Sequence, residues 1–400
     1  MQLVEQHIVS KHSPVYNECD RLCSASKNIY NRALYLIQQE YKTTQTYNHY
    51  NDLYGTMKNE ECLAQLPPKV AQATLRMVHG VVKSFFAMLH SEKVNKSNVN
   101  FPHFLNKTHG KYVTLFNNQT ISKKVYKASH KIKLSQCNIE FYTKIDNFNQ
   151  INCVTIIPQK EQYTISVTYT VPDVEKQKCN RKYASIDLGV NNLATVTFSE
   201  KGLQPLIFNG KPLKSINQFY NKELSKAKSK LEKINKRKHS HRTNRLTIKR
   251  NNKINNYLHK VSKHIVSSMV ERGVTTLIIG KNPEWKTSSN MGSMNNQNFV
   301  QIPHSRFIEM LKYKCEKVGI SVRIQEESYT SKCSFLDLEE IEKHEIYKGK
   351  RIKRGLYQSN NGRLINADVN GSYNIMRKAF PKLFKNGIEG VVVHPIVIKL

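Results

Sequence analysis

Apolar side chains in the first part of the chain follow two different spacings, and each predicts a different element. Residues 2–9 read as a strand. Ser13-Pro14 is expected to cap a first helix, and Pro67-Pro68 is expected to open a second. The buried stripe of the first helix is expected to contain Cys19, Leu22, Ile29, Tyr30, Ala33 and Ile37. That of the second is expected to contain Val70, Thr74, Val78, Val81, Phe85 and Leu89. From 98 to 172 the apolar runs are short and β-prone, most clearly at 164–171, which predicts a small β-barrel or sheet with helices inserted after its first strand.

The second half of the chain alternates strands and helices in a definite order. The predicted elements are strands at 183–188, 193–198 and 205–208, a helical region at 222–266, a strand at 275–279, a helix at 304–318, a strand at 320–326 and a helix from about 367. Three strands, then helix, strand, helix, strand and helix is the layout of an RNase H-like domain. The fold class is therefore α/β plus β.

Two aspartates lie at the edges of these predicted elements, far apart in sequence. Asp187 ends a strand and is followed by Leu188-Gly189, while Asp368 lies in the first turn of the last helix, just after a capping Asn366. Carboxylates brought together from distant segments repel each other unless a divalent cation lies between them. The pattern predicts a two-metal Mg²⁺ site of the kind that hydrolyses phosphodiesters.

The charge of the chain points to the same chemistry. It has 63 Lys and Arg against 30 Asp and Glu among 400 residues, a net charge of +33. Compositional bias toward Lys and Asn, or a solvated basic surface, accounts for part of this excess. An excess of this size still predicts salt-sensitive binding to nucleic acid, and 20 Tyr and 15 Phe provide rings for stacking on bases. Candidate nucleic-acid contacts are Lys226, Lys230, Lys233, Arg237 and Arg354.

Targeting signals and cysteine spacing exclude other classes. The chain shows no signal-peptide pattern and no apolar run long enough for a membrane span, so we expect a cytoplasmic prokaryotic protein with no membrane partner. Its 8 cysteines form no Cys-x-x-Cys pair, which favours reduced thiols over disulfides.

At three motifs the chain resembles TnpB, the RNA-guided nuclease of bacterial insertion sequences that is related to type V CRISPR effectors. The motifs are Ile186–Asn191, Tyr329–Ser334 and Asn366–Ile375, and Tyr30–Leu34 and Phe101–Phe104 resemble the family in outline. The resemblance implies a wedge-type β-barrel (1–12 and 98–176), a helical recognition insertion (13–97) and a RuvC-like nuclease domain (181–333 and 366–385). It also implies a guide RNA and target double-stranded DNA as partners.

The first departure from the family concerns a third carboxylate. The family usually carries a glutamate at the end of the fourth nuclease strand, where this chain has Gly280-Lys281-Asn282. Either the nuclease is inactive, or the carboxylate has moved to Glu326 or Glu327 at the end of the fifth strand, roughly 10 Å from the Asp187 strand. Gly280 would leave the space between them open.

Alternation along the fifth strand decides between the two glutamates. Val322, Ile324 and Glu326 share a face, which predicts Glu326 against the core and Glu327 on the opposite face. Relatives with the same Gly-Lys-Asn variant carry Glu-x-Tyr-Thr-Ser, which also favours Glu327. The predicted catalytic and metal-binding set is Asp187, Glu327 and Asp368, with Glu326 as the alternative; two surface glutamates at a strand end are the competing interpretation.

The second departure concerns zinc. The family normally has a four-cysteine zinc finger between its second and third motifs, but here only Cys333 and His344 could serve, and two ligands do not close a tetrahedral site. We expect no zinc. The basic insert at 334–365 is either a solvated hairpin or a lid that guides a nucleic-acid strand over the site.

These observations predict an RNA-guided DNA endonuclease that uses two Mg²⁺ ions. The alternatives are a catalytically inactive RNA-guided DNA-binding repressor and an accessory protein of transposition. The state of the third carboxylate decides between the first two.

Overall fold

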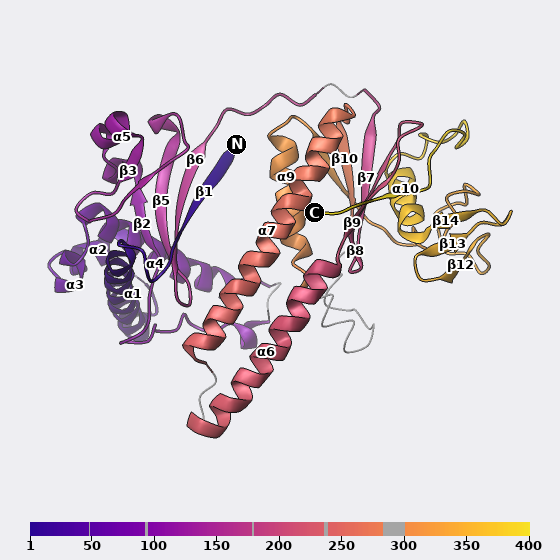
Figure 1. Cartoon of the computed structure of the whole chain (residues 1–400). Coiled ribbons are helices and arrows are strands. Elements are labelled where there is room, and N and C mark those ends of the chain that lie inside the picture. Colours follow the sequence, from indigo (N-terminus) through magenta and orange to yellow (C-terminus); the bar gives the residue numbers. More distant parts are fainter. Residues whose placement is uncertain (48, 93–94, 178–179, 236–238, 283–300) are drawn as a thin grey trace. The chain divides into compact units, whose positions relative to one another are not determined.

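The chain forms two compact units, Met1–Pro172 and Asp173–Leu400 (Figure 1). The computed structural model describes residues 1–47, 49–92, 95–177, 180–235, 239–282 and 301–400. Among these residues no helix is both long enough and apolar enough to cross a membrane.

Unit 1 is built on an antiparallel sheet of four strands in the order β1-β6-β5-β2. These are β1 (Gln2–Val9), β6 (Tyr163–Thr170), β5 (Ile151–Pro158) and β2 (Thr114–Asn117). β3 (Lys131–Lys133) and β4 (Glu140–Tyr142) form a separate pair beside α5 (Lys123–Ser129). Short 3₁₀ turns occur at Lys96–Asn98, Asn118–Thr120 and Phe148–Gln150. The predicted strand at 2–9 is confirmed, and the wedge-type barrel stays a prediction.

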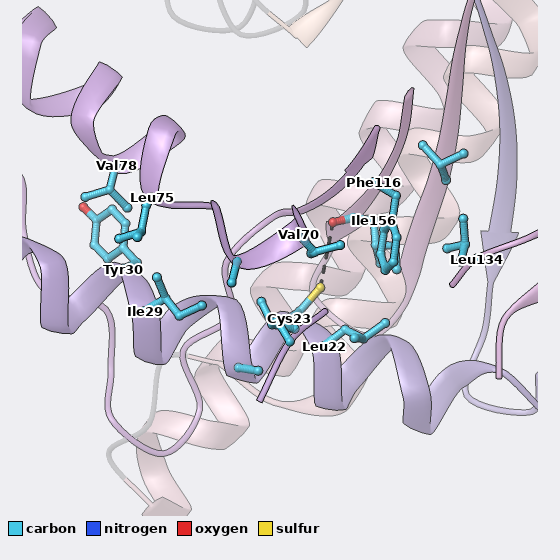
Figure 2. Close-up of a cluster of buried hydrophobic side chains, with 14 of the residues drawn as sticks. Leu22, Cys23, Ile29, Tyr30, Val70, Leu75, Val78, Phe116, Leu134 and Ile156 are labelled. Carbon is cyan, nitrogen blue, oxygen red and sulfur yellow. Dashed lines mark hydrogen bonds between the residues drawn. The ribbon is translucent and has the colours of Figure 1, made fainter. Parts of the chain in front are cut away.

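Four helices lie between β1 and β2 in sequence: α1 (Tyr16–Thr44), α2 (Tyr50–Met57), α3 (Glu61–Ala64) and α4 (Pro68–Leu89). The stripe predicted for α1 is buried, and Figure 2 shows Leu22 and Ile29 of α1 with Val70 and Leu75 of α4 in one core. Two details of the prediction were wrong. The N-cap of α1 is Val15, without a side-chain hydrogen bond, because the chain still turns at Ser13. On α4, Val81 is 37% exposed while Val82 is buried, because the buried stripe continues from Val78 by a step of four residues instead of three.

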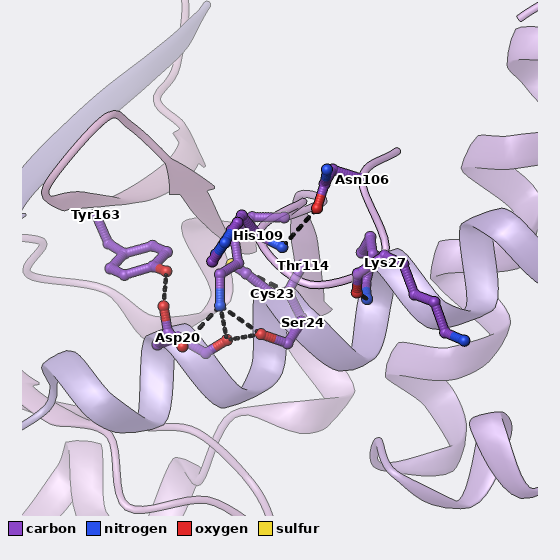
Figure 3. Close-up of polar contacts among 10 residues, drawn as sticks. Asp20, Cys23, Ser24, Lys27, Asn106, His109, Thr114 and Tyr163 are labelled. Atoms are coloured by element: carbon purple, nitrogen blue, oxygen red, sulfur yellow. Dashed lines mark hydrogen bonds and ion pairs between the residues drawn. The ribbon is translucent and has the colours of Figure 1, made fainter. Parts of the chain in front are cut away.

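Polar side chains also fix α1 to the sheet of unit 1. Asp20 accepts hydrogen bonds from the Tyr163 hydroxyl at 2.6 Å and from the Lys111 ammonium at 2.7 Å. Figure 3 shows Asp20, Ser24 and Tyr163 in this network. An ion pair with hydrogen bonds on both sides aligns helix and sheet more specifically than apolar packing alone does.

Unit 2 contains a six-stranded sheet in the order β11-β10-β7-β8-β9-β15. The strands are β7 (Tyr183–Leu188), β8 (Asn192–Phe198), β9 (Leu206–Asn209), β10 (Thr276–Gly280), β11 (Ser321–Gln325) and β15 (Ile396–Ile398). β7, β8 and β9 are antiparallel, whereas β10 and β11 continue the sheet parallel to β7. This confirms the predicted RNase H-like layout; β15, which joins β9, was not predicted.

Alternation along the strands divides the core of unit 2 between the two faces of the sheet. Apolar residues of one face, such as Ile186 and Leu277, pack with α7 (His241–Glu271) and α9 (His304–Glu316). On the other face Tyr183 and Ile278 pack with α10 (Ala367–Ala379). Because Ser185 and Asp187 share the face of Tyr183, α10 is the helix that faces Asp187.

The helical region predicted at 222–266 is two helices, α6 (Lys211–Asn235) and α7. On α7 the apolar residues at helical spacing, Ile254, Leu258, Val261 and Ile265, are all buried, but on α6 the apolar residues at this spacing are buried only in part. Ala227 is buried, whereas Ile234 is 74% exposed. The apolar spacing of α6 therefore continues beyond the residues that it buries.

The basic insert forms a small antiparallel sheet of β12 (Lys350–Lys353), β13 (Leu356–Gln358) and β14 (Leu364–Asn366), which leads directly into α10. The turn before it is organised by Glu339, a carboxylate that is 2% exposed. Glu339 accepts the backbone N–H groups of Ser334 and Lys348, each at 2.7 Å. A single buried side chain thus joins the two ends of the segment 334–348.

Candidate active site

Asp187 lies near the end of β7, on the sheet face covered by α10. The helix approaches closely there because small residues meet: the Ser185 hydroxyl donates to the Ser372 carbonyl at 2.7 Å. Gly371 leaves no side chain in the way, since a Cβ on it would lie 2.9 Å from Asp187 Oδ2. The pKa of Asp187 is raised well above its usual value by removal from water and by the nearby carboxylates of Asp368 and Glu327, which Arg351 partly offsets.

Asp368 lies in the first turn of α10, as predicted. The Asn366 side chain caps this helix by accepting the N–H groups of Asp368 at 2.9 Å and Val369 at 3.2 Å, which confirms the predicted cap. One Asp368 oxygen accepts a hydrogen bond from the Asn192 amide at 2.6 Å. The other lies 3.6 Å from a guanidinium nitrogen of Arg351, on the exposed strand β12.

Glu327 follows the end of β11 and lies over Gly280, at the end of the neighbouring strand β10. A Cβ on Gly280 would lie 2.6 Å from Glu327 Oε2 and 2.5 Å from Ile375 Cδ1. The space expected to be open beside Gly280 is therefore filled, because Glu327 and Ile375 both pack onto the glycine. Burial and, to a smaller extent, the Glu326 carboxylate raise the pKa of Glu327 to about 7, while Lys378 acts in the opposite direction.

Glu326 has other partners. It forms an ion pair with Lys378 and accepts hydrogen bonds from the backbone N–H and the hydroxyl of Ser328. The expectation that its face packs against the core was wrong: Ile324 is 41% exposed and the Glu326 side chain is also 41% exposed. β11 is the edge strand of the sheet, so its apolar alternation continues past the buried part.

Two residues near the carboxylates were given no role at the site from the sequence. Arg351 was only one cation of the basic insert, and Asn192 only part of the run that follows Asp187. Nothing in the sequence distinguishes Arg351 from the other cations of the insert. Its position is set by the pairing of β12 with β13 and of β13 with β14. The position of Asn192 could have been predicted from the sequence. A strand that pairs antiparallel with β7 places its first residues beside the end of β7 that carries Asp187.

The donor set suits a hard divalent cation, because carboxylate oxygens are the ligands that Mg²⁺ prefers. The repulsion that raises the Asp187 pKa is the repulsion that a bound cation would relieve. Within the described residues, however, no three acidic, His or Cys side chains already converge closely enough to form a metal cage. Asp368 would have to exchange part of its contact with Asn192 and Arg351 for a metal ion.

The candidate nucleic-acid contacts lie on exposed surfaces. Lys226, Lys230 and Lys233 are exposed on α6, where Lys226 is 3.5 Å from Glu223, and Arg354 is exposed after β12. Arg237 lies outside the described residues. None of these cations contacts the three carboxylates in the described part of the chain.

The two candidate zinc ligands contact different backbone carbonyls. The Cys333 thiol is 3.6 Å from the Glu342 carbonyl, and His344 Nε2 is 2.8 Å from the Glu340 carbonyl. The expectation of no zinc stays a prediction, with Glu339 as the residue that joins this region.

The strand order of unit 2 defines its class as a domain with an RNase H-like sheet. Residues 166–286 match the family described as probable transposase, and residues 304–375 match the Cas12f1-like TNB domain. The TnpB-like protein ORF457 of Acidianus two-tailed virus is 25% identical over 233 residues, 56% of this chain and 45% of the relative. The chain is similar to TnpB proteins in these regions, and its match spans about half the length of that relative.

Among solved structures, similarity extends over most of the chain at low superposition scores. A Cas12f1–sgRNA–target DNA complex is 15% identical with a TM-score of 0.38, covering 93% of this chain and 98% of that one. C2c1 of Alicyclobacillus acidoterrestris in complex with single-guide RNA is 8% identical with a TM-score of 0.40, covering 91% and 65%. The similarity to TnpB proteins therefore rests on the sequence matches.

Proposed function

We propose that this protein is an RNA-guided DNA endonuclease that cleaves guide-matched DNA with two Mg²⁺ ions. The observation that carries the proposal is the position of Glu327 over Gly280. A carboxylate stands beside the end of β10, where the family glutamate would project, although the backbone that supplies it belongs to the turn after β11. Similarity to TnpB-like proteins supports guide RNA and target DNA as the partners.

Asp187, Glu327 and Asp368 would hold the metal ions. Bound there, the ions would supply an activated water and stabilise the leaving 3′ oxygen of the phosphodiester. Asp187 is fixed by β7 and by the close approach of α10, so its carboxylate needs little reorganisation. Asn192 keeps one Asp368 oxygen oriented.

Arg351 has a separate role in this proposal. In the absence of nucleic acid its guanidinium faces Asp368. A phosphate that enters the site offers a bidentate anionic partner, so Arg351 would turn from the carboxylate to the phosphate oxygens. This exchange would release Asp368 for metal binding when substrate is present.

The proposal extends to the domain arrangement. Unit 1, with helices between β1 and β2, corresponds to a wedge-type domain with a recognition insertion. The exposed cations of α6, including Lys226, Lys230 and Lys233, would contact nucleic-acid backbone and contribute affinity rather than sequence specificity.

The test is Mg²⁺-dependent cleavage of guide-matched DNA by the full chain purified with its own RNA. We expect wild type to cut and Asp187→Ala and Glu327→Ala to abolish cutting while target binding persists. Glu326→Ala should retain residual cutting. If Glu326→Ala is inactive and Glu327→Ala cuts normally, the third ligand is misassigned.

A second candidate is RNA-guided binding without cleavage. Two observations favour it. Both Asp368 oxygens already have partners, Asn192 and Arg351, and the described residues contain no preformed group of three metal ligands. Tight binding of guide-matched DNA by wild type, with no cutting in Mg²⁺ or Mn²⁺, would support this candidate and overturn the nuclease.

A further inference from the structure

One face of α10 contacts the elements that carry each carboxylate of the candidate site. Asp368, Gly371, Ile375 and Lys378 are spaced by three, four and three residues, so they lie along a single helical face. The face begins with Asp368, and Gly371 then makes room for Asp187. Further along, Ile375 packs against Gly280 beside Glu327, and Lys378 forms an ion pair with Glu326.

The turn that carries Glu327 is held from a second side by the end of β10. The backbone N–H of Glu327 donates to Asn282 Oδ1 at 3.0 Å. The Thr330 hydroxyl donates to the Glu327 carbonyl at 2.8 Å, and the Asn374 amide of α10 donates to the Thr330 carbonyl at 2.9 Å. Hydrogen bonds from two separate elements thus fix the backbone on either side of the Glu327 side chain.

This turn needs such support, because its backbone is strained. Tyr329 has a φ of 65°, in the left-handed region that a bulky non-glycine residue adopts only when its surroundings impose it. Lys378 contributes by donating to the Ser328 carbonyl at 3.0 Å as well as pairing with Glu326. Without these contacts we expect the turn to relax and Glu327 to leave Gly280.

We propose that Asn282, Glu326 and Lys378 are positioning residues that hold the relocated carboxylate Glu327 in the site, and that Glu326 is an anchor of this turn rather than a metal ligand. This inference rests on the proposed function. It explains why Gly280 and Asn282 occur together: Gly280 provides space for the carboxylate, and Asn282, two residues later, fixes the backbone that carries Glu327.

The first test is cleavage by the protein–RNA complex at increasing Mg²⁺ concentration. Removing a residue that orients a metal ligand typically costs about 10- to 100-fold in metal affinity or activity. We expect Asn282→Leu, Glu326→Gln and Lys378→Met to lose that much and to need more Mg²⁺, whereas Glu327→Gln should not cut at any concentration. Equal loss in Glu326→Gln and Glu327→Gln would overturn the anchor role.

Conservative variants and neighbouring lysines separate positioning from general destabilisation. Asn282→Asp keeps an acceptor oxygen and Lys378→Arg keeps a cation, so both should retain most activity. Lys281→Met and Lys382→Met remove exposed lysines beside the same elements and should leave cutting unchanged. If the lysine controls lose as much activity as Lys378→Met, charge and not position explains the effect.

A double-mutant cycle tests whether Glu326 acts through Lys378. If the two residues form one anchor, Glu326→Gln combined with Lys378→Met should lose little more than either single variant. Multiplicative losses in the double variant would mean independent roles and would overturn the proposed pair.

A readout independent of cleavage activity is hydroxyl-radical scission of the polypeptide by Fe²⁺ bound in place of Mg²⁺. The wild-type polypeptide should be cleaved near Asp187, Glu327 and Asp368, and Asp187→Ala should suppress cleavage of the polypeptide at all three places. In Asn282→Leu and Lys378→Met we expect the cut near Glu327 to weaken while the other two persist. Unchanged scission near Glu327 in both variants would overturn the positioning role, and no site-specific scission in wild type would overturn the metal site itself.

Discussion

At the scale of single residues, the candidate site is defined by carboxylates that repel one another. Asp187 is half-buried, faces two other carboxylates and has its pKa raised by both, while Arg351 is the cation that offsets them. Glu327 is shifted in the same direction, mainly by burial. Such an arrangement lowers the stability of the metal-free fold, and proteins retain it where the charges are used for function.

Removing the charge of Asp187 should therefore stabilise the metal-free protein. A carboxyl whose pKa is raised on folding binds its proton more tightly when folded, so its contribution to stability is lost as pH rises through that pKa. We expect Asp187→Asn to unfold at a higher temperature than wild type in chelator, with a difference that grows with pH, and to lose cleavage.

Thermal unfolding across a pH series checks this prediction, with the exposed Asp146→Asn as the control for removal of any one acidic charge. A lower unfolding temperature for Asp187→Asn at every pH would contradict it.

The close contact at Gly280 leads to a second prediction at this scale. Gly280→Ala places a Cβ within 2.6 Å of Glu327 Oε2 and within 2.5 Å of Ile375 Cδ1, so the carboxylate must move. We expect cleavage to fall sharply with only a modest loss of stability. Gly80→Ala is the matched control, because nothing lies within 4 Å of the added methyl group and Ala favours the helix.

The reciprocal exchange sharpens this test. In a Glu327→Ala background, Gly280→Glu should restore part of the cleavage by supplying a carboxylate from β10 instead of from the turn. Activity of Gly280→Ala equal to that of wild type would show that Glu327 is not needed at this position.

At the scale of elements, the sequence predicted most of unit 2 because its strands are apolar runs between clear turn signals. Asp187 and Asp368 could be assigned for the same reason, since a strand end and a helix cap are local patterns. The face of Glu326 could not be predicted, because its ion pair with Lys378 joins β11 to α10 across 52 residues. The same limit applies to Arg351, whose partner belongs to another element.

The cap of α10 offers a test of how a helix positions Asp368 in the candidate site. Asn366 accepts the N–H groups of Asp368 and Val369, so Asn366→Ala should cost about 0.5–2 kcal/mol of stability and loosen the turn that carries Asp368. Denaturant unfolding and the Mg²⁺ dependence of cleavage measure the two effects. Asn366→Asp preserves the cap and should resemble wild type; equal loss in both variants would exclude capping as the cause.

The insert offers a second test, because Glu339 joins the two ends of the segment 334–348. In Glu339→Gln one amide nitrogen would oppose a backbone N–H, leaving a buried donor unsatisfied at a cost of about 1–3 kcal/mol. We expect faster proteolysis within 334–365 in this variant, and no effect of a zinc chelator on wild type.

Glu340→Gln, at an exposed neighbouring position, is the control for the insert. Loosening of the wild-type insert by the chelator alone would mean that a metal ion, rather than Glu339, organises this segment.

At the scale of the whole molecule, charge is the dominant property. A net charge of +33 over 400 residues attracts any polyanion, and the cations lie in both units, so attraction alone does not reveal where nucleic acid binds. Each contact with a phosphate releases counterions, so the salt dependence of affinity counts contacts instead of net charge. Salt dependence therefore distinguishes a binding surface from a merely solvated basic one.

The exposed lysines of α6 provide the last test. Changing Lys226, Lys230 and Lys233 to Gln removes three cations, and if each contacts a phosphate the slope of log affinity for RNA against log salt should fall by about two. The matched control changes Lys58, Lys69 and Lys83 of unit 1, which are also exposed and remove the same charge. We expect the α6 variant to lose more of the slope than the control, as measured by RNA binding over a range of salt concentrations. Equal losses would mean that RNA responds to overall charge, and α6 would then carry a solvated basic face rather than a binding surface.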